Sequence, residues 1–188
     1  MTPHCNGAAR LNSFALVSYL PDPLGSFLDR LRGRLEPNSL KPRAHVTLLP
    51  PRQLCAPERV EPAWDQLISQ LTQEPPLHIS LGPIRIFPGT HVIYVAVTKG
   101  FEELVRLHAR LNAADLEFCE RFPYHPHITL VQNLSQAEAE EVAQQAAEQW
   151  ATFRGARDFH TDKLTFVQET HDKRWVDLKQ VTLTPVPA

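Results

Sequence analysis

The stretches AHVTL, at residues 44–48, and PHITL, at residues 126–130, are near copies of each other and decide the fold. Short runs of valine, isoleucine, leucine and threonine favour β-strands. Side chains alternate between the two faces of a strand, so in each stretch the histidine and the threonine share one face, and the apolar residues share the other. The sequence therefore predicts two strands that each present an imidazole beside a hydroxyl.

This pairing suits chemistry at a phosphate. An imidazole has its ordinary pKa near neutrality, and a hydroxyl two residues along can donate a hydrogen bond to a phosphate oxygen. We therefore predict that His45 and His127 are an acid–base pair and that Thr47 and Thr129 bind the substrate phosphate. The competing interpretation is two half-buried strand histidines bonded to the backbone, with threonines present for their β-propensity.

A third His-x-Ser/Thr tripeptide serves as a warning, because about one is expected by chance in a chain of this composition. His78 is followed by Ser80 at the start of an expected strand over residues 77–87. It lacks the proline or small residue that precedes the other two histidines. We therefore predict that His78 is structural.

The composition is that of a globular protein. The chain has 188 residues, of which 43% are hydrophobic, so we expect one two-lobed domain over residues 1–188 with its own core. Nineteen basic and 21 acidic residues give a net charge of −2, which argues against tight, sequence-independent binding to long nucleic acid. RNA ends or small nucleotides remain as expected partners, and we expect a monomer without an obligate protein partner.

Cysteines and targeting signals point to a reducing compartment. Cys5, Cys55 and Cys119 are few and widely spaced, and no Cys/His cluster has the spacing of a zinc site. The first twelve residues do not resemble a signal peptide, and no apolar run is long enough to cross a bilayer. We expect a cytoplasmic protein with no membrane association, no metal and no cofactor.

Hydrophobic periodicity and turn residues predict an alternation of strands and helices. Strands are expected at 14–20, 44–49, 77–87, 92–98, 127–131, 163–169 and 174–183, and helices at 25–35, 57–73, 101–116 and 135–150. The last helix begins with a capping box, Ser135 and Glu138. The fold class is α+β: bilobal and internally duplicated, with two antiparallel-rich sheets flanking a central groove and the helices outside.

Several other side chains are candidates for the groove. Tyr124 and His125 precede the second motif, and four isolated cations could supply positive charge to a phosphate near the groove: Arg43, Arg52, Lys173 and Arg174. We interpret His125 as a surface residue and leave Tyr124 open between stacking and packing. Trp150 and Trp175 are expected to pack the lobes together.

The paired motifs HVTL and HITL, the context PHITL and the closing hairpin resemble the two-histidine phosphoesterase superfamily, which includes 2′-5′ RNA ligase-like proteins and cyclic phosphodiesterases. The resemblance covers about residues 14–183. It implies a bilobal fold in which both motifs line one groove and hydrolyse or form 2′-linked phosphodiesters without a metal. His45, Thr47, His127 and Thr129 match the family motif position by position.

Two other functions compete with a cyclic phosphodiesterase. A non-catalytic RNA-end or nucleotide-binding protein would keep the groove for recognition alone. A metal-dependent hydrolase would need carboxylates near the histidines, and these strands have none in their immediate sequence. The physiological substrate, and which histidine is the acid, stay open at this point.

Overall fold

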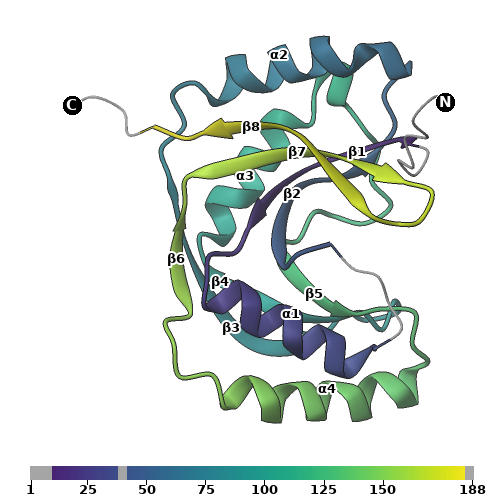
Figure 1. Cartoon of the computed structure of the whole chain (residues 1–188), viewed down its shortest axis with the longest axis vertical. Coiled ribbons are helices and arrows are strands. Elements are labelled where there is room, and N and C mark those ends of the chain that lie inside the picture. Colours follow the sequence, from purple (N-terminus) through teal and green to yellow (C-terminus); the bar gives the residue numbers. More distant parts are fainter. Residues whose placement is uncertain (1–9, 38–41, 185–188) are drawn as a thin grey trace, which may run out of the picture.

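Two antiparallel sheets of four strands each form the centre of the molecule (Figure 1). The computed structural model describes residues 10–37 and 42–184. The first sheet has the order β2 (His45–Arg52), β1 (Arg10–Tyr19), β7 (Lys163–Thr170) and β8 (Trp175–Thr182). The second has the order β5 (His127–Val131), β4 (Ile93–Lys99), β3 (Leu77–Ile86) and β6 (Asp158–Thr161). The predicted α+β class with two antiparallel sheets is confirmed.

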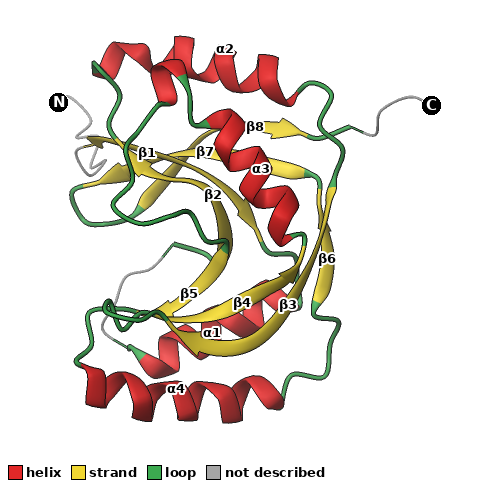
Figure 2. Ribbon diagram, turned by 180° about the vertical axis from the view of Figure 1, so that it is seen from behind, coloured by secondary structure: helices red, strands yellow, loops and turns green. Residues whose placement is uncertain are grey.

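Helices cover the outer faces of the sheets (Figure 2). They are α1 (Leu24–Leu35), α2 (Val60–Leu71), α3 (Phe101–Leu111) and α4 (Gln136–Ala151), with short 3₁₀ turns η1 (Pro57–Arg59) and η2 (Ala114–Leu116). Each half of the chain repeats a strand–helix–strand unit, β1–α1–β2 and β4–α3–β5, whose two strands pair antiparallel. This is the internal duplication that the repeated motif predicts.

The two halves exchange their helices. Helix α1 follows the first strand of the first sheet but packs against β5 and α4 of the other lobe, and α3 packs against β2 of the first sheet. Each sheet therefore buries its outer face against a helix from the other half of the sequence. The exchange holds β2 and β5, the edge strands that carry the repeated motifs, against each other.

Strand alternation divides the apolar residues between two faces. Phe14 and Leu16 of β1 lie in the main hydrophobic core under the helices, whereas Ala15 and Val17 point to the opposite face, together with Val167. We call this opposite face, which carries His45, the inner face of the first sheet, and we call the face of the second sheet that carries His127 its inner face. The inner face of the first sheet is apolar near its middle and polar toward β2.

Several observed elements differ in detail from the predicted ones: β1 begins earlier, at Arg10, and β2 continues through the two prolines to Arg52. The helix expected over 101–116 ends at Leu111, because the Asn112 side chain bonds the backbone of Phe118 and the chain turns at Ala114, whose φ is 49°. The four-residue strand β6 was not predicted, since it is too short for a periodic signal. The capping box at Ser135 and Glu138 is confirmed.

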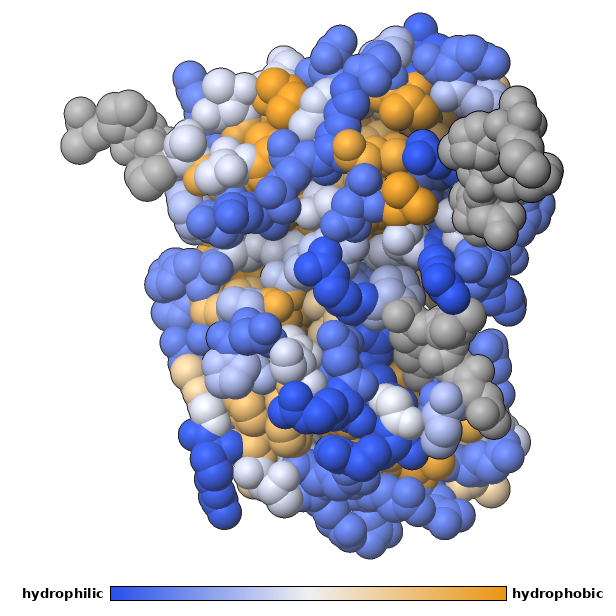
Figure 3. All heavy atoms as spheres, viewed as in Figure 1, coloured by the Kyte–Doolittle hydropathy of each residue, from blue (hydrophilic) through white to orange (hydrophobic). Residues whose placement is uncertain are grey.

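The surface in Figure 3 is largely hydrophilic, with small apolar patches between charged side chains. This agrees with the nearly balanced charge of the chain. Among the described residues, no helix combines the length and the apolar character needed to cross a bilayer.

Candidate active site

His45 and His127 open the two strands that meet at the centre of the molecule. His45 is the first residue of β2 and His127 the first of β5, and both side chains are half-buried. The two strands lie against each other, and the imidazoles are near enough for a charge on His127 to lower the pKa of His45. The structure thus brings together the two motifs, which are far apart in the sequence.

The same backbone contact fixes both imidazole rings. Nδ1 of His45 lies 2.6 Å from the carbonyl oxygen of Arg43, and Nδ1 of His127 lies 2.7 Å from that of His125. A carbonyl oxygen can only accept a hydrogen bond, so Nδ1 carries the hydrogen in both rings. In the neutral state Nε2 is then the basic nitrogen of each ring. Two rings in the same tautomer are thus held by carbonyls two residues earlier in the chain.

Burial keeps both imidazoles neutral. It lowers the pKa of His45 to about 4, against the raising effect of the Arg43 carbonyl; the positive charge of Arg32, and any charge on His127, lower it further. Burial also lowers the pKa of His127. At neutral pH, without a ligand, both rings are therefore uncharged and able to accept a proton at Nε2.

The threonines lie where strand alternation places them. Thr129 Oγ1 is 3.1 Å from Nε2 of His127, so the hydroxyl donates to the neutral ring. Thr47 is half-buried on the same face of β2 as His45, opposite Val17 of β1. Both motifs thus place a hydroxyl beside an imidazole on an inner face.

Aromatic side chains surround His45. The Tyr19 ring meets it edge-on with centroids 6.3 Å apart, and the Trp175 ring lies at 4.8 Å. Arg43 lies over the Tyr19 ring and forms an ion pair with Asp177, which also accepts a hydrogen bond from the Tyr19 hydroxyl at 2.6 Å. Burial and Asp177 raise the pKa of Tyr19 to about 12. Trp175 therefore packs on the inner face of the first sheet, and the prediction that it joins the lobes is wrong.

A second aromatic group surrounds His127. Phe87 and Tyr94 stack with centroids 3.9 Å apart, and His127 meets both rings edge-on at 4.9 and 5.5 Å. His125 contacts the same two rings and also Phe101, so it is half-buried in this cluster instead of lying on the open surface as predicted. Each imidazole thus has an aromatic wall of its own.

Tyr124 packs behind the motifs and links their strands. Its hydroxyl donates to the Thr47 carbonyl oxygen at 2.6 Å, and its ring stacks on His108 at 3.9 Å. His108 in turn bonds the carbonyl oxygen of Leu48 through Nδ1 at 2.7 Å. Because Tyr124 is three residues before His127, this contact ties the entry to β5 directly to β2. The open alternatives for Tyr124 resolve to packing.

Most other candidate cations lie away from the histidine pair. Arg52 is buried and bonds Glu120 at 2.8 Å, so it supports the core. Arg174 pairs with Asp172 beside Lys173 in the exposed turn between β7 and β8. Only Arg43 adjoins a motif, through its carbonyl and through its guanidinium over Tyr19.

His78 belongs to a different cluster on β3 and β6. Its ring stacks on His160 at 4.5 Å, and Nε2 lies 3.6 Å from a carboxylate oxygen of Asp158. Strand β4 separates β3 from β5, so His78 is not part of the His45–His127 pair. Within residues 10–37 and 42–184, no three or more His, Cys, Asp or Glu side chains are placed to hold a metal ion.

Sequence reasoning missed the aromatic walls. Tyr19 ends an apolar run and Trp175 starts a terminal strand, so each has an ordinary packing role in the sequence alone. Their places follow from cross-strand pairing: Tyr19 is the direct partner of His45 across β1 and β2, and Tyr94 that of Thr129 across β4 and β5. That pairing requires the sheet register, which the sequence did not supply.

The model of the 2′-5′ RNA ligase superfamily matches residues 20–173, and this chain belongs to that superfamily. A Bacillus pumilus protein named "Putative phosphoesterase" is 28% identical over 130 residues, which cover 69% of this chain and 75% of that protein. The recognised resemblance to two-histidine phosphoesterases is confirmed.

Solved structures share the fold at low sequence identity. Escherichia coli LigT, solved with NADP⁺, has a TM-score of 0.63 at 19% identity and covers 94% of this chain and 98% of its own. The Thermus thermophilus protein TT0787 has a TM-score of 0.64 at 16% identity and covers 92% of this chain and 98% of its own. The bilobal arrangement is thus that of LigT-like proteins over nearly the whole chain.

Proposed function

We propose that this chain is a phosphodiesterase that hydrolyses 2′,3′-cyclic or 2′-5′ linked phosphodiesters of RNA ends and small nucleotides, with His45 and His127 as its acid–base pair and no metal ion. One observation carries the proposal: the matched tautomers of two neighbouring imidazoles, each held at Nδ1 by a backbone carbonyl, with the Thr129 hydroxyl at Nε2 of His127 and Thr47 on the same face of β2 as His45. Membership of the 2′-5′ RNA ligase superfamily supports it.

Hydrolysis of a cyclic phosphate needs one proton removed and one delivered. A neutral imidazole takes a proton at Nε2 from the attacking water, and a protonated imidazole on the opposite side of phosphorus gives its Nε2 proton to the departing ribose oxygen. The new P–O bond forms as the P–O bond to that oxygen breaks, which leaves a phosphate monoester and a free hydroxyl. The two histidines end the step with exchanged protonation states.

The electrostatics of the two histidines allows one to act as the base and the other as the acid. Burial holds both imidazoles neutral in the free protein. An anionic phosphate between them favours a charged ring, so substrate binding itself raises the pKa of the imidazole that becomes the acid. The side from which the leaving oxygen enters then decides which of the two histidines takes that role.

The threonines act on the non-bridging oxygens of the phosphate. Negative charge grows on these oxygens in the pentacoordinate transition state, and a hydroxyl donor already in place stabilises it. In the free protein the Thr129 hydroxyl donates to Nε2 of His127. Once that nitrogen is protonated it no longer accepts, so the same hydroxyl becomes available to the phosphate.

Ligation uses the same groups. A 5′-hydroxyl of a second RNA end attacks the 2′,3′-cyclic phosphate in place of water and gives its proton to the neutral imidazole, while the bond from phosphorus to the 3′ oxygen breaks and that oxygen takes the proton of the charged imidazole. A 2′-5′ linkage thus forms without a nucleotide cofactor. Among the similar structures are LigT complexes with phosphate, ATP and 3′-AMP, which supports a site that accepts nucleotide phosphates.

The direct test is hydrolysis of a panel of nucleoside 2′,3′-cyclic phosphates in the presence of a chelator. We compare wild type with His45→Ala, His127→Ala and the control His78→Ala, and confirm the folding of each by thermal unfolding. Loss of one acid–base group lowers the rate about 10²- to 10⁴-fold, so the first two variants should be nearly inactive and the third active.

Three other results would overturn the proposal. Turnover that survives loss of His45 or His127 would reject the acid–base pair. Loss of wild-type turnover in chelator, restored by a divalent metal, would favour a metal-dependent hydrolase. Nucleotide binding without any wild-type turnover would favour a non-catalytic RNA-end or nucleotide-binding protein.

A further inference from the structure

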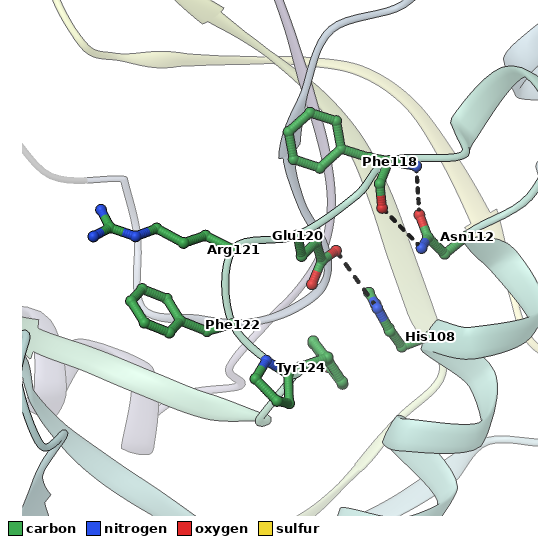
Figure 4. Close-up of a pocket in the computed structure, with 8 residues that line it drawn as sticks. His108, Asn112, Phe118, Glu120, Arg121, Phe122 and Tyr124 are labelled. Carbon is green, nitrogen blue, oxygen red and sulfur yellow. Dashed lines mark hydrogen bonds and ion pairs between the residues drawn. The ribbon is translucent and has the colours of Figure 1, made fainter.

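A pocket of about 370 Å³ lies at the segment that leads into β5 (Figure 4). Its walls come from the end of α3, through His108 and Asn112, and from residues 118 and 120–124. Tyr124, which lines the pocket, donates a hydrogen bond to the Thr47 carbonyl and is three residues before His127. Three residues of chain span at most about 11 Å. Tyr124 therefore places one wall of the pocket close to His127 along the chain.

The pocket segment carries an unusual pair of exposed rings. Phe118 and Phe122, exposed by 41% and 55%, are the large hydrophobic side chains that lie open to solvent in the described parts of the chain. Figure 4 shows both rings projecting from the same loop, with the Arg121 side chain beside Phe122. The Arg121 guanidinium lies 5.2 Å from the centroid of that ring. We call Phe118, Arg121 and Phe122 the aromatic platform.

The platform is held rigidly at its first end. Asn112 accepts a hydrogen bond from the Phe118 backbone N–H at 3.0 Å and donates one to the Phe118 carbonyl at 3.1 Å. Arg52, at the end of β2, donates to the Leu116 carbonyl at 2.6 Å and to Glu120 at 2.8 Å. A preorganised surface loses little conformational entropy when a ligand binds. Two exposed rings on an anchored backbone are thus ready to bind a planar partner.

The charges of the segment also favour a nucleic acid. Glu120 is neutralised by Arg52 and lies 3.5 Å from His108. Arg121 is exposed and forms no ion pair with any residue of the described chain, so its charge is free for a phosphate. Aromatic rings that stack on bases, together with an unpaired arginine, are the usual elements of single-strand binding. A peptide partner would not need both the exposed aromatic rings and the unpaired arginine.

We propose that the aromatic platform stacks the base of a nucleotide adjacent to the reacting phosphate, so that the substrate is a single-stranded oligoribonucleotide end and not a mononucleotide. This inference rests on the proposed function for the reacting phosphate and adds the substrate class. Phe122 supplies the more exposed stacking surface, and Arg121 contacts the neighbouring phosphate. The predicted preference is for substrates with at least one nucleotide beyond the cyclic phosphate.

The test compares two substrates on matched variants. One substrate is adenosine 2′,3′-cyclic phosphate, and the other is a five-nucleotide RNA that ends in a 2′,3′-cyclic phosphate. Stacking of one base contributes enough binding that Phe122→Ala should lower kcat/KM for the RNA about 5- to 150-fold and leave the mononucleotide unchanged. Phe122→Trp keeps a ring and should retain RNA turnover. Arg121→Ala should lower kcat/KM for the RNA and leave that for the mononucleotide unchanged. Arg154→Ala, which removes an exposed arginine of the other lobe, is its control and should change neither.

A binding experiment separates this inference from the proposed function. The probe is the same RNA with a 3′-phosphate and with 2-aminopurine at successive positions, whose fluorescence falls when the base stacks. Quenching in wild type that is lost in Phe122→Ala supports the platform even if no substrate is turned over. An equal loss of activity on both substrates, or RNA binding that is unchanged in Phe122→Ala, would overturn it.

Discussion

Acid should destabilise this protein through His45, and a variant without the imidazole should resist acid better than wild type. Burial lowers the pKa of His45 to about 4, whereas an unfolded chain has the ordinary value of 6.5. Between these values the unfolded state binds the proton and the folded state does not. The unfolding free energy is therefore unaffected by this pKa difference above pH 6.5, and it falls progressively as the pH is lowered from 6.5 to 4.

The magnitude follows from the size of the pKa shift. A difference of one pH unit in pKa corresponds to about 1.36 kcal/mol, so lowering from 6.5 to about 4 corresponds to at most about 3 kcal/mol of unfolding free energy. That is a large fraction of the stability of an ordinary domain. The buried, neutral imidazole of His45 should therefore make the folded protein measurably less stable at low pH.

Urea unfolding at several pH values between 7.5 and 4 measures this cost. Wild type should lose about 3 kcal/mol more than His45→Gln over that range, while His171→Gln, a change in an exposed turn, should follow wild type. Only the pH slopes are compared, because His45→Gln also loses the bond to the Arg43 carbonyl. Parallel slopes for wild type and His45→Gln would refute the argument that burial keeps this ring neutral.

Three further outcomes are expected. Because the pKa of His45 and that of His127 both lie below 6.5 while one ring must be charged for catalysis, kcat/KM should fall about tenfold per pH unit from 6.5 to 8.5, and a flat profile would contradict this. Thr129→Val should lower kcat on a cyclic phosphate about a hundredfold, whereas Thr129→Ser, which keeps the donor, should stay near wild type. Arg52→Leu should lower the unfolding free energy by about 3 kcal/mol in urea titrations because Glu120 stays partly buried without its partner, and Glu120→Gln in the same chain should restore part of the loss.

Local sequence rules predicted much of the fold. The strand β5 was predicted at its observed bounds, and the capping box correctly marked the start of α4. The expected helix over 101–116 was too long, because its end depends on Asn112, which bonds Phe118 and Arg52. Contacts between residues that are distant in the sequence override the periodic pattern there.

The candidate site also has features that local sequence rules predicted and features that only the structure revealed. Alternation along a strand predicted that His45 and Thr47 share a face, and the structure agrees, as it does for His127 and Thr129. Trp175 was misread because its place beside His45 requires β8 to lie in the first sheet, two strands away from β1. The catalytic roles of these residues stay a prediction until the variants are measured.

The sequence by itself determined most of the helices and strands, and it determined which residues share a face in the two motif strands. Alternation and helical periodicity depend only on neighbouring residues. The tertiary structure alone decided that β2 and β5 are edge strands placed against each other, since this depends on α1 and α3 each packing on the sheet of the other half. It also decided the tautomer and the pKa of each imidazole. Those properties depend on the position of the carbonyls of Arg43 and His125 and on the depth of burial, which only the packed chain defines.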